Sequence, residues 1–110
     1  VGYIPDMIFD RELDYLSDLG IDHPPVASNS VSVQLNLIRQ GAGVGVVHDF
    51  ALPAVPEVRR ILTADFSLTR AFHLIRHADD RRVPRIERFA AALVAGMRAE
   101  VTRLEAYIQN

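Results

Sequence analysis

The distribution of hydrophobic and polar residues along the chain predicts strands that alternate with helices. Short apolar runs between turn residues are typical of buried strands, and four such segments are predicted: 1–4, 44–47, 58–62 and 68–77. Apolar residues at helical spacing predict three helices: 10–20, 31–40 and 83–107. Strands that alternate with helices favour the α/β class, with a mostly parallel sheet flanked by helices and a long C-terminal helix.

Capping residues mark the ends of the first two predicted helices. Asp10 precedes the first helix, and Asn29 or Ser30 precedes the second. Gly20 and Gly41 stand at their C-terminal ends, where a left-handed backbone favours glycine. The apolar residues of the second helix cover a wide arc, which predicts that this helix is well buried.

Three glycines at every second position in "QGAGVGVV", residues 40–47, suggest a phosphate-binding loop at first sight. Such loops follow a strand and open a helix, because the helix start offers free N–H groups. Here the glycines follow a helix and open a strand, so the order is reversed and a nucleotide loop is not expected. Gly45, inside the predicted strand, is instead interpreted as a point of close approach between the strand and a neighbour.

Composition narrows the class of protein. The 110 residues are 49% hydrophobic, which is enough for a core of one domain or one lobe. The net charge of −2, with acids and bases scattered, shows no basic patch for nucleic acid. No cysteine is present, which excludes disulfides. No apolar run approaches the ~18 residues of a membrane span, so no membrane partner is expected.

The polar residues do not form a catalytic or metal-binding pattern. The four histidines are scattered, without HExxH or HxH spacing and without carboxylates at ligand spacing beside them. The nucleophile elbow G-x-S-x-G is absent, and Asp79 and Asp80 are interpreted as a solvated turn. We therefore expect a protein that is not an enzyme and that has no catalytic residues, no cofactor and no metal.

The most promising binding feature is the polar turn Ser28–Asn29–Ser30. It lies between an extended segment and a buried helix, so the free N–H groups of that helix face the rim of the predicted sheet. Ligands of open α/β sheets bind at the rim formed by the carboxyl ends of the strands. The alternative interpretation is that these residues only cap the helix.

Three stretches together resemble the effector-binding domain of LysR-type transcriptional regulators: VGYIPDMIFDRELDYL, SNSVSVQLNLIRQGAGVGVVHDFAL and FHLIRHADDRRVPRIERF. The resemblance covers nearly the whole chain. The positions that match the family pattern are Ser28, Ser30, Gln34, Gly41, Gly43 and the segment 44–47. No single motif is strict, but their order and spacing together are fairly specific.

The resemblance implies a two-lobed fold like that of periplasmic binding proteins (type II), with a small effector in the cleft between the lobes. It implies that residues 1–67 form most of the second lobe, and that residues 68–110 return toward the first lobe. The DNA-binding helix–turn–helix is expected in an N-terminal part outside this chain. A cytoplasmic homo-oligomer, dimer or tetramer, that contacts DNA only through that part is expected.

His48 departs from the family pattern, which commonly has proline after the strand. The resemblance places Val47 and His48 at the edge of the cleft, beside the turn Ser28–Asn29–Ser30. These five residues are therefore the predicted effector-binding residues, for a small anion such as a carboxylate. His48 either donates a hydrogen bond to the effector or titrates near neutral pH, or it only bonds a neighbouring group. A solute-binding receptor of a transport system, with the same fold, is the alternative function.

Overall fold

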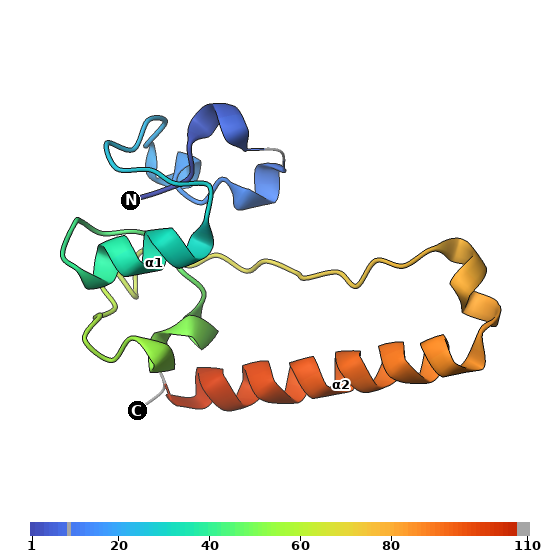
Figure 1. Ribbon diagram of the computed structural model, residues 1–110. Helices are drawn as coiled ribbons and strands as arrows, with labels where there is room; N and C mark the ends of the chain where they lie inside the picture. The colour runs from blue at the N-terminus through green and yellow to red at the C-terminus, as the bar shows by residue number, and fades with distance from the viewer. Residues whose placement is uncertain (9, 108–110) are drawn as a thin grey trace. The chain divides into compact units, whose positions relative to one another are not determined.

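The chain consists of two compact units, residues 1–70 and residues 71–110. The computed structural model describes residues 1–8 and 10–107 (Figure 1). Phe9 and Ile108, which belong to the apolar patterns of two predicted helices, lie outside the described residues.

The first unit is built mainly from short turns and extended segments around one α-helix. Its elements are η1 (Pro5–Met7), η2 (Arg11–Leu13), η3 (Ser17–Leu19), α1 (Val31–Arg39) and η4 (Asp49–Ala54), the four η elements being 3-10 helices. Pro53 lies inside η4.

The prediction of one helix over residues 10–20 is wrong, because η2 and η3 take its place. Asp10 caps η2 as expected, its carboxylate accepting a hydrogen bond from the Glu12 N–H. Asp14 then leaves helical geometry, with φ −85° and ψ 86°, and its side chain accepts from the Ser17 N–H. A side chain that bonds the nearby backbone competes with a continuous helix, and here it starts a second turn.

The structure confirms α1 at its predicted position. The Ser30 hydroxyl accepts a hydrogen bond from the Val33 N–H, and Gly41 follows the helix with φ 85°. The prediction that this helix is well buried is wrong: Val31 and Val33 are 49% and 46% exposed. The apolar residues of α1 cover a wider arc of the helix than the rest of the first unit covers. Gln34 is the one buried residue of α1.

The predicted parallel sheet is not confirmed, since the described residues contain no strand, only one isolated parallel bridge between Gly2 and Ala27. The Gly2 N–H donates to the Val26 carbonyl at 3.1 Å, and the Ser28 N–H donates to the Gly2 carbonyl at 2.9 Å. On the other side, the N-terminal amine of Val1 donates to the Val44 carbonyl at 2.6 Å. The first residues therefore lie between two extended segments.

Extended backbone counts as a sheet only where neighbouring segments exchange a ladder of hydrogen bonds. Segments 58–62 and 68–77 make no such ladder with any part of the chain that the structure describes. Close approach at Gly45 is confirmed: a Cβ there would lie 2.8 Å from the Ile38 Cδ1 and 3.0 Å from the Val1 carbonyl oxygen.

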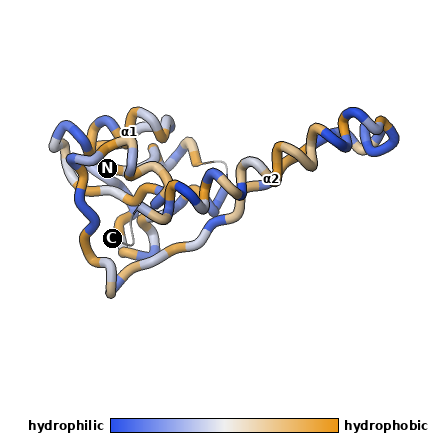
Figure 2. The backbone as a smooth tube through the Cα atoms, turned by 90° about the horizontal axis from the view of Figure 1, so that it is seen from below, coloured by the Kyte–Doolittle hydropathy of each residue, from blue (hydrophilic) through white to orange (hydrophobic). Residues whose placement is uncertain are grey.

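The second unit contains an extended segment over residues 71–77, η5 (Ala78–Arg82) and α2 (Pro84–Ala106). The predicted helix over 83–107 is confirmed, with Pro84 in the first helical position, where its missing N–H costs nothing. The Arg76 guanidinium pairs with Glu87 at 2.9 Å. Figure 2 shows hydrophobic and hydrophilic residues alternating along α2, as expected for an amphipathic helix.

Candidate functional site

The turn before α1 is held by hydrogen bonds among its own residues. The Ser28 hydroxyl accepts from the Ser30 N–H at 3.1 Å, and the Ser30 hydroxyl accepts from the Val33 N–H at 3.4 Å. Both hydroxyl oxygens thus serve the backbone as acceptors, while each O–H remains able to donate. Asn29, between them, is exposed.

Gln34 holds this turn in place through two hydrogen bonds. It is only 4% exposed, and its side-chain amide donates to the Ser28 carbonyl at 2.7 Å. Its backbone N–H donates to the Ser30 carbonyl at 3.0 Å. Since a buried polar group without a partner is costly, these bonds fix where the turn lies on α1.

Two N–H groups remain at the start of α1. Within the described part of the chain, the Val31 and Ser32 N–H groups have no hydrogen-bond partner. Both groups lie in the first turn, where the helix dipole favours negative charge. Two O–H donors and two N–H donors therefore surround the start of this helix, without a carboxylate in its first turn.

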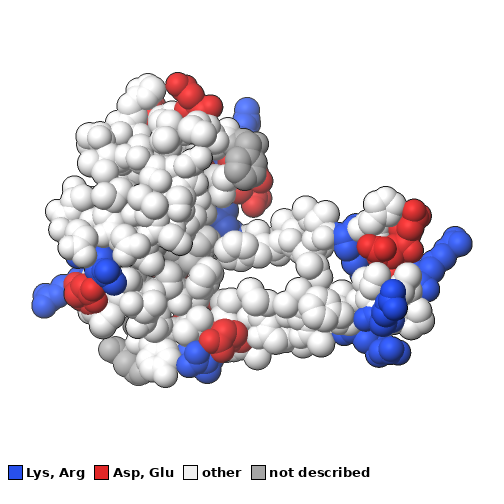
Figure 3. Space-filling view, viewed as in Figure 1, with Lys and Arg blue, Asp and Glu red and all other residues white. Residues whose placement is uncertain are grey.

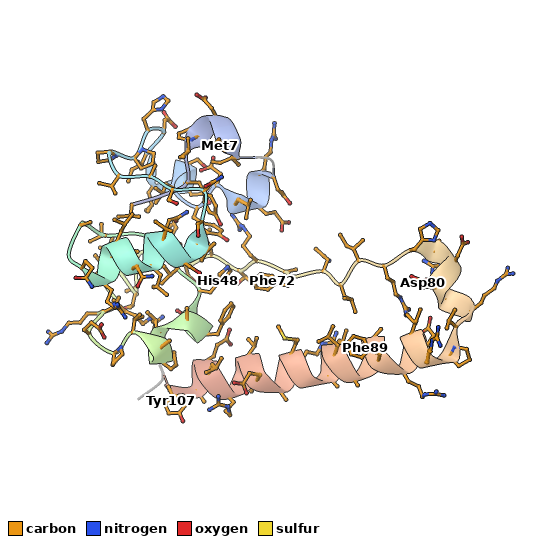
Figure 4. All side chains as sticks on the ribbon, viewed as in Figure 1. Met7, His48, Phe72, Asp80, Phe89 and Tyr107 are labelled. Carbon is orange, nitrogen blue, oxygen red and sulfur yellow. The ribbon has the colours of Figure 1, made fainter. Side chains whose placement is uncertain are left out.

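His48 lies at the other predicted part of the site, directly before η4 (Figure 4). Its Nε2 is 3.3 Å from the Tyr15 hydroxyl, and its ring stacks on Phe50 with centroids 5.0 Å apart. The Arg70 guanidinium lies over the Tyr15 ring, 5.8 Å from its centroid. His48 is half-buried and so is Val47, so the imidazole is held on two sides but stays accessible.

A small cavity of about 20 Å³ lies nearby, lined among others by Tyr3, Tyr15, Gln34 and Val46. It has room for about one water molecule and not for an effector. Burial raises the pKa of the Tyr3 hydroxyl, and it raises that of the Tyr15 hydroxyl although the Arg70 cation opposes the shift. Both phenols are therefore neutral donors at neutral pH.

The structure brings Ser28 and Ser30 together, while His48 is held by Tyr15 and Phe50. Residues 1–2 bond the 26–28 segment on one side and Val44 on the other, so they lie between the two segments that lead to these groups. The adjacency of the serine turn and the Val47–His48 pair therefore stays a prediction. Sequence reasoning did not assign Tyr15 and Gln34 to the site. A glutamine among apolar residues of α1 was the available signal for Gln34, whereas Tyr15 carries no local signal.

Across residues 1–8 and 10–107, no three histidine, cysteine or acidic side chains gather closely enough to hold a metal ion. Within the same residues, no helix is both long and apolar enough to cross a bilayer.

A comparison with protein families decides between the regulator and the receptor. The model of the LysR substrate binding domain matches residues 5–98. The chain belongs to the LysR substrate-binding domain family. No curated protein and no solved structure matches it. The LysR substrate-binding domain is a ligand-sensing part of transcriptional regulators, which are not enzymes, and its fold is like that of periplasmic binding proteins.

Proposed function

We propose that this chain senses a small anionic effector for a LysR-type transcriptional regulator, and that the effector binds at the start of α1. The family match over residues 5–98 supports the sensing role. The observation that carries the position is the set of free donors around the turn: the Val31 and Ser32 N–H groups and the Ser28 and Ser30 hydroxyls. Such donors with a helix dipole favour a carboxylate or a similar anion.

The effector site also includes Asn29, Val47 and His48 in this proposal. Asn29 is exposed beside the serines and offers a neutral amide. His48 presents a ring whose position is set by Tyr15 and Phe50, so it can meet the effector without losing much side-chain freedom.

The proposed role includes the rest of the regulator. Residues 1–67 belong to the second lobe of the effector-binding domain, and residues 68–110 lead back toward the first lobe. The effector biases a homo-oligomer, dimer or tetramer, between two states in the cytoplasm, and DNA is contacted by a separate domain. A small ligand can shift such an equilibrium only through its different affinity for the two states.

Ser30→Glu tests the position of the site. We expect acetate, titrated against chloride at constant ionic strength, to shift the NMR signals of the Val31 and Ser32 N–H groups. Ser30→Glu places a like charge among the donors and abolishes these shifts. Ser30→Ala removes one hydroxyl and weakens binding by about 0.5–1.5 kcal/mol, which is about two- to tenfold.

Ser67→Glu is the matched control, because it adds the same charge at an exposed position of the first unit. It should leave the acetate response unchanged. Equal responses of wild type and Ser30→Glu would show that the serine turn only caps α1.

A further inference from the structure

The His48 imidazole is held on two sides by aromatic side chains of the first unit. Its Nε2 lies 3.3 Å from the Tyr15 hydroxyl oxygen, and the two rings meet edge to face at 85°. The Phe50 ring lies nearly parallel to the imidazole, with an angle of 9° between the two planes. The Tyr15 contact therefore fixes one nitrogen of the ring, and the Phe50 contact fixes its plane.

The hydrogen bond between Tyr15 and His48 can run in either direction. A neutral imidazole has one nitrogen that donates and one that accepts, and a tyrosine hydroxyl can do both. If Tyr15 donates, Nε2 is the acceptor and the imidazole proton lies on Nδ1. If Tyr15 accepts, Nε2 carries a proton, either in the other neutral tautomer or in the imidazolium. The surroundings of the two side chains decide between these directions.

A second histidine, at the same kind of position, uses its Nδ1 as an acceptor. His77 precedes η5 as His48 precedes η4, and its Nδ1 accepts a hydrogen bond from the Asp79 N–H at 3.2 Å. An Nδ1 that accepts carries no proton, so neutral His77 is the Nε2–H tautomer. His48 forms no such side-chain cap of η4. The first turn of η4 therefore does not require the Nδ1 of His48 as an acceptor, and this nitrogen can carry the proton.

A cation beside the Tyr15 ring favours Tyr15 as the donor. The Arg70 guanidinium carbon lies 5.8 Å from the centre of that ring, within the range of a cation–π interaction. The Glu12 carbonyl holds it there, because Arg70 Nε donates to this oxygen at 2.9 Å. A positive charge at the ring withdraws electron density from the hydroxyl oxygen. The O–H becomes a stronger donor and the oxygen a weaker acceptor.

The other charges near the pair do not oppose this direction. Burial raises the pKa of Tyr15, Arg70 opposes the shift and Glu12 adds to it, so the hydroxyl keeps its proton at neutral pH. Asp49, next to His48 in the chain, pairs with Arg60 at 3.7 Å. Figure 3 shows that the visible face of the first unit is largely uncharged, with charged side chains at its edges. Arg70 is therefore the charge placed to set the direction of this hydrogen bond.

We propose that Tyr15, supported by Arg70, donates to His48 Nε2 and thereby holds the proton of the neutral imidazole on Nδ1. His48 then meets the effector as an uncharged Nδ1–H donor, which is complementary to a carboxylate oxygen. An imidazole side chain that no neighbour constrains prefers its proton on Nε2, so Tyr15 inverts the ordinary preference. Tyr15 and Arg70 are positioning residues. The assignment rests on the proposed function, because only there is His48 an effector residue.

Nitrogen NMR of the imidazole rings tests the tautomer. Spectra of the 110-residue chain are recorded at about pH 8, above the usual imidazole pKa of about 6.5. His48→Gln identifies the His48 signals, and His77 is the internal reference for the Nε2–H tautomer. We expect a protonated Nδ1 and an unprotonated Nε2 in His48. Tyr15→Phe removes only the hydroxyl, so the ratio of Nδ1–H to Nε2–H should fall about two- to tenfold, the effect of one hydrogen bond.

Matched variants separate the hydroxyl from the charge. Tyr3→Phe removes the same group from the neighbouring tyrosine, whose ring centroid lies 6.2 Å from that of Tyr15, and should leave the ratio unchanged. Arg70→Met removes the charge and should lower the ratio, whereas Arg70→Lys keeps a cation and should restore most of it. A changed ratio with unchanged amide signals in α1 is a result that a merely structural role of Tyr15 does not produce.

Acetate, titrated against chloride at constant ionic strength, connects the tautomer with the effector site. In wild type it should shift the His48 Nδ1 signal together with the Val31 and Ser32 N–H signals. Tyr15→Phe should weaken acetate binding about two- to fivefold, since fewer molecules then present the Nδ1–H donor.

The contrary results distinguish this inference from the proposed function. If wild-type His48 carries its proton on Nε2, or Tyr15→Phe leaves the ratio unchanged, the inference is overturned. If acetate shifts the helix signals but not the Nδ1 signal, the donor role of His48 is overturned, while the site at the start of α1 stands. If acetate moves none of these signals although the tautomer is as expected, the proposed function fails and only the effect of Tyr15 on the imidazole remains.

Discussion

The two units differ in how far apart in the sequence the residues lie that bond one another within each unit. In residues 1–70, the Val1 amine reaches the Val44 carbonyl, Tyr15 reaches His48, and Arg70 donates to the Glu12 carbonyl 58 positions away. In residues 71–107, the ion pairs that the structure describes stay within α2 and the segment before it: Arg76 pairs with Glu87 in the first turn of α2, and Glu100 pairs with Arg103. The first unit therefore depends on tertiary contacts, and the second on the stability of one helix.

The difference also explains where a binding site can form. Contacts between distant segments hold polar groups of different parts of the chain in one place, as Gln34 holds the Ser28 carbonyl. A single helix places side chains only along its own surface. The effector site is accordingly proposed in the first unit.

Gly96→Pro breaks the second unit and should have the largest effect. Proline inside a helix removes a hydrogen bond and clashes with the preceding turn, at a cost of about 3 kcal/mol or more. We expect α2 to lose helix content in circular dichroism, while amide hydrogen exchange in α1 is unchanged. Gly96→Ala is the control and should stabilise α2 by about 1 kcal/mol, since nothing lies within 4 Å of the added Cβ. Loss of protection in α1 would show that the first unit depends on α2.

Gln34→Leu tests the tertiary character of the first unit. The substitution leaves the half-buried Ser28 carbonyl without its donor, which should lower the free energy of unfolding of this unit by about 1–3 kcal/mol. Chemical denaturation followed by the tyrosines measures the loss. Asn36→Leu is the control: Asn36 is exposed and its amide bonds only the Ser32 carbonyl of its own helix. If the two variants lose the same free energy of unfolding, Gln34 stabilises the first unit no more than an exposed residue of the same helix does.

Gly41→Val probes a smaller, local contribution within the first unit. Gly41 has φ 85°, a left-handed conformation that a β-branched residue adopts at a cost of about 1–2 kcal/mol. Space is not the cause, because no atom lies within 4 Å of a Cβ built there. The denaturation midpoint should fall for Gly41→Val and fall less for Gly41→Asn. An unchanged midpoint would mean that α1 ends differently in solution.

Alkaline pH should weaken the first unit slightly. Burial raises the pKa of Tyr3 and of Tyr15 above their usual value of 10.0. The folded state then holds these protons more tightly than the unfolded chain, so their contribution is full below pH 10 and is lost as the pH rises through the folded pKa. Denaturation as a function of pH measures this, and Tyr15→Phe should flatten the profile. If the free energy of unfolding of the first unit stays constant as the pH rises above 10, the raised pKa values of Tyr3 and Tyr15 are contradicted.

Part of the candidate site could be predicted from the sequence. A cap at Asn29 or Ser30 and a left-handed Gly41 were predicted, and the structure shows Ser30 as the cap of α1 and Gly41 with φ 85°. The pairing of Tyr15 with His48 could not be predicted, because the two residues are 33 positions apart and neither carries a pattern that names the other. The helix predicted over residues 10–20 failed because Asp14 bonds the Ser17 N–H and starts a new turn.

The sequence by itself determined α1, α2 and their boundaries, because helix hydrogen bonds and caps involve residues only a few positions apart. Only the tertiary structure decided which extended segments meet. Strand-length patterns at 1–4, 44–47, 58–62 and 68–77 indicated segments suited to a sheet, yet only the first of them forms a bridge, with Ala27. A strand needs hydrogen-bond partners from elsewhere in the chain, and hydrophobic periodicity contains no information about which segment supplies them.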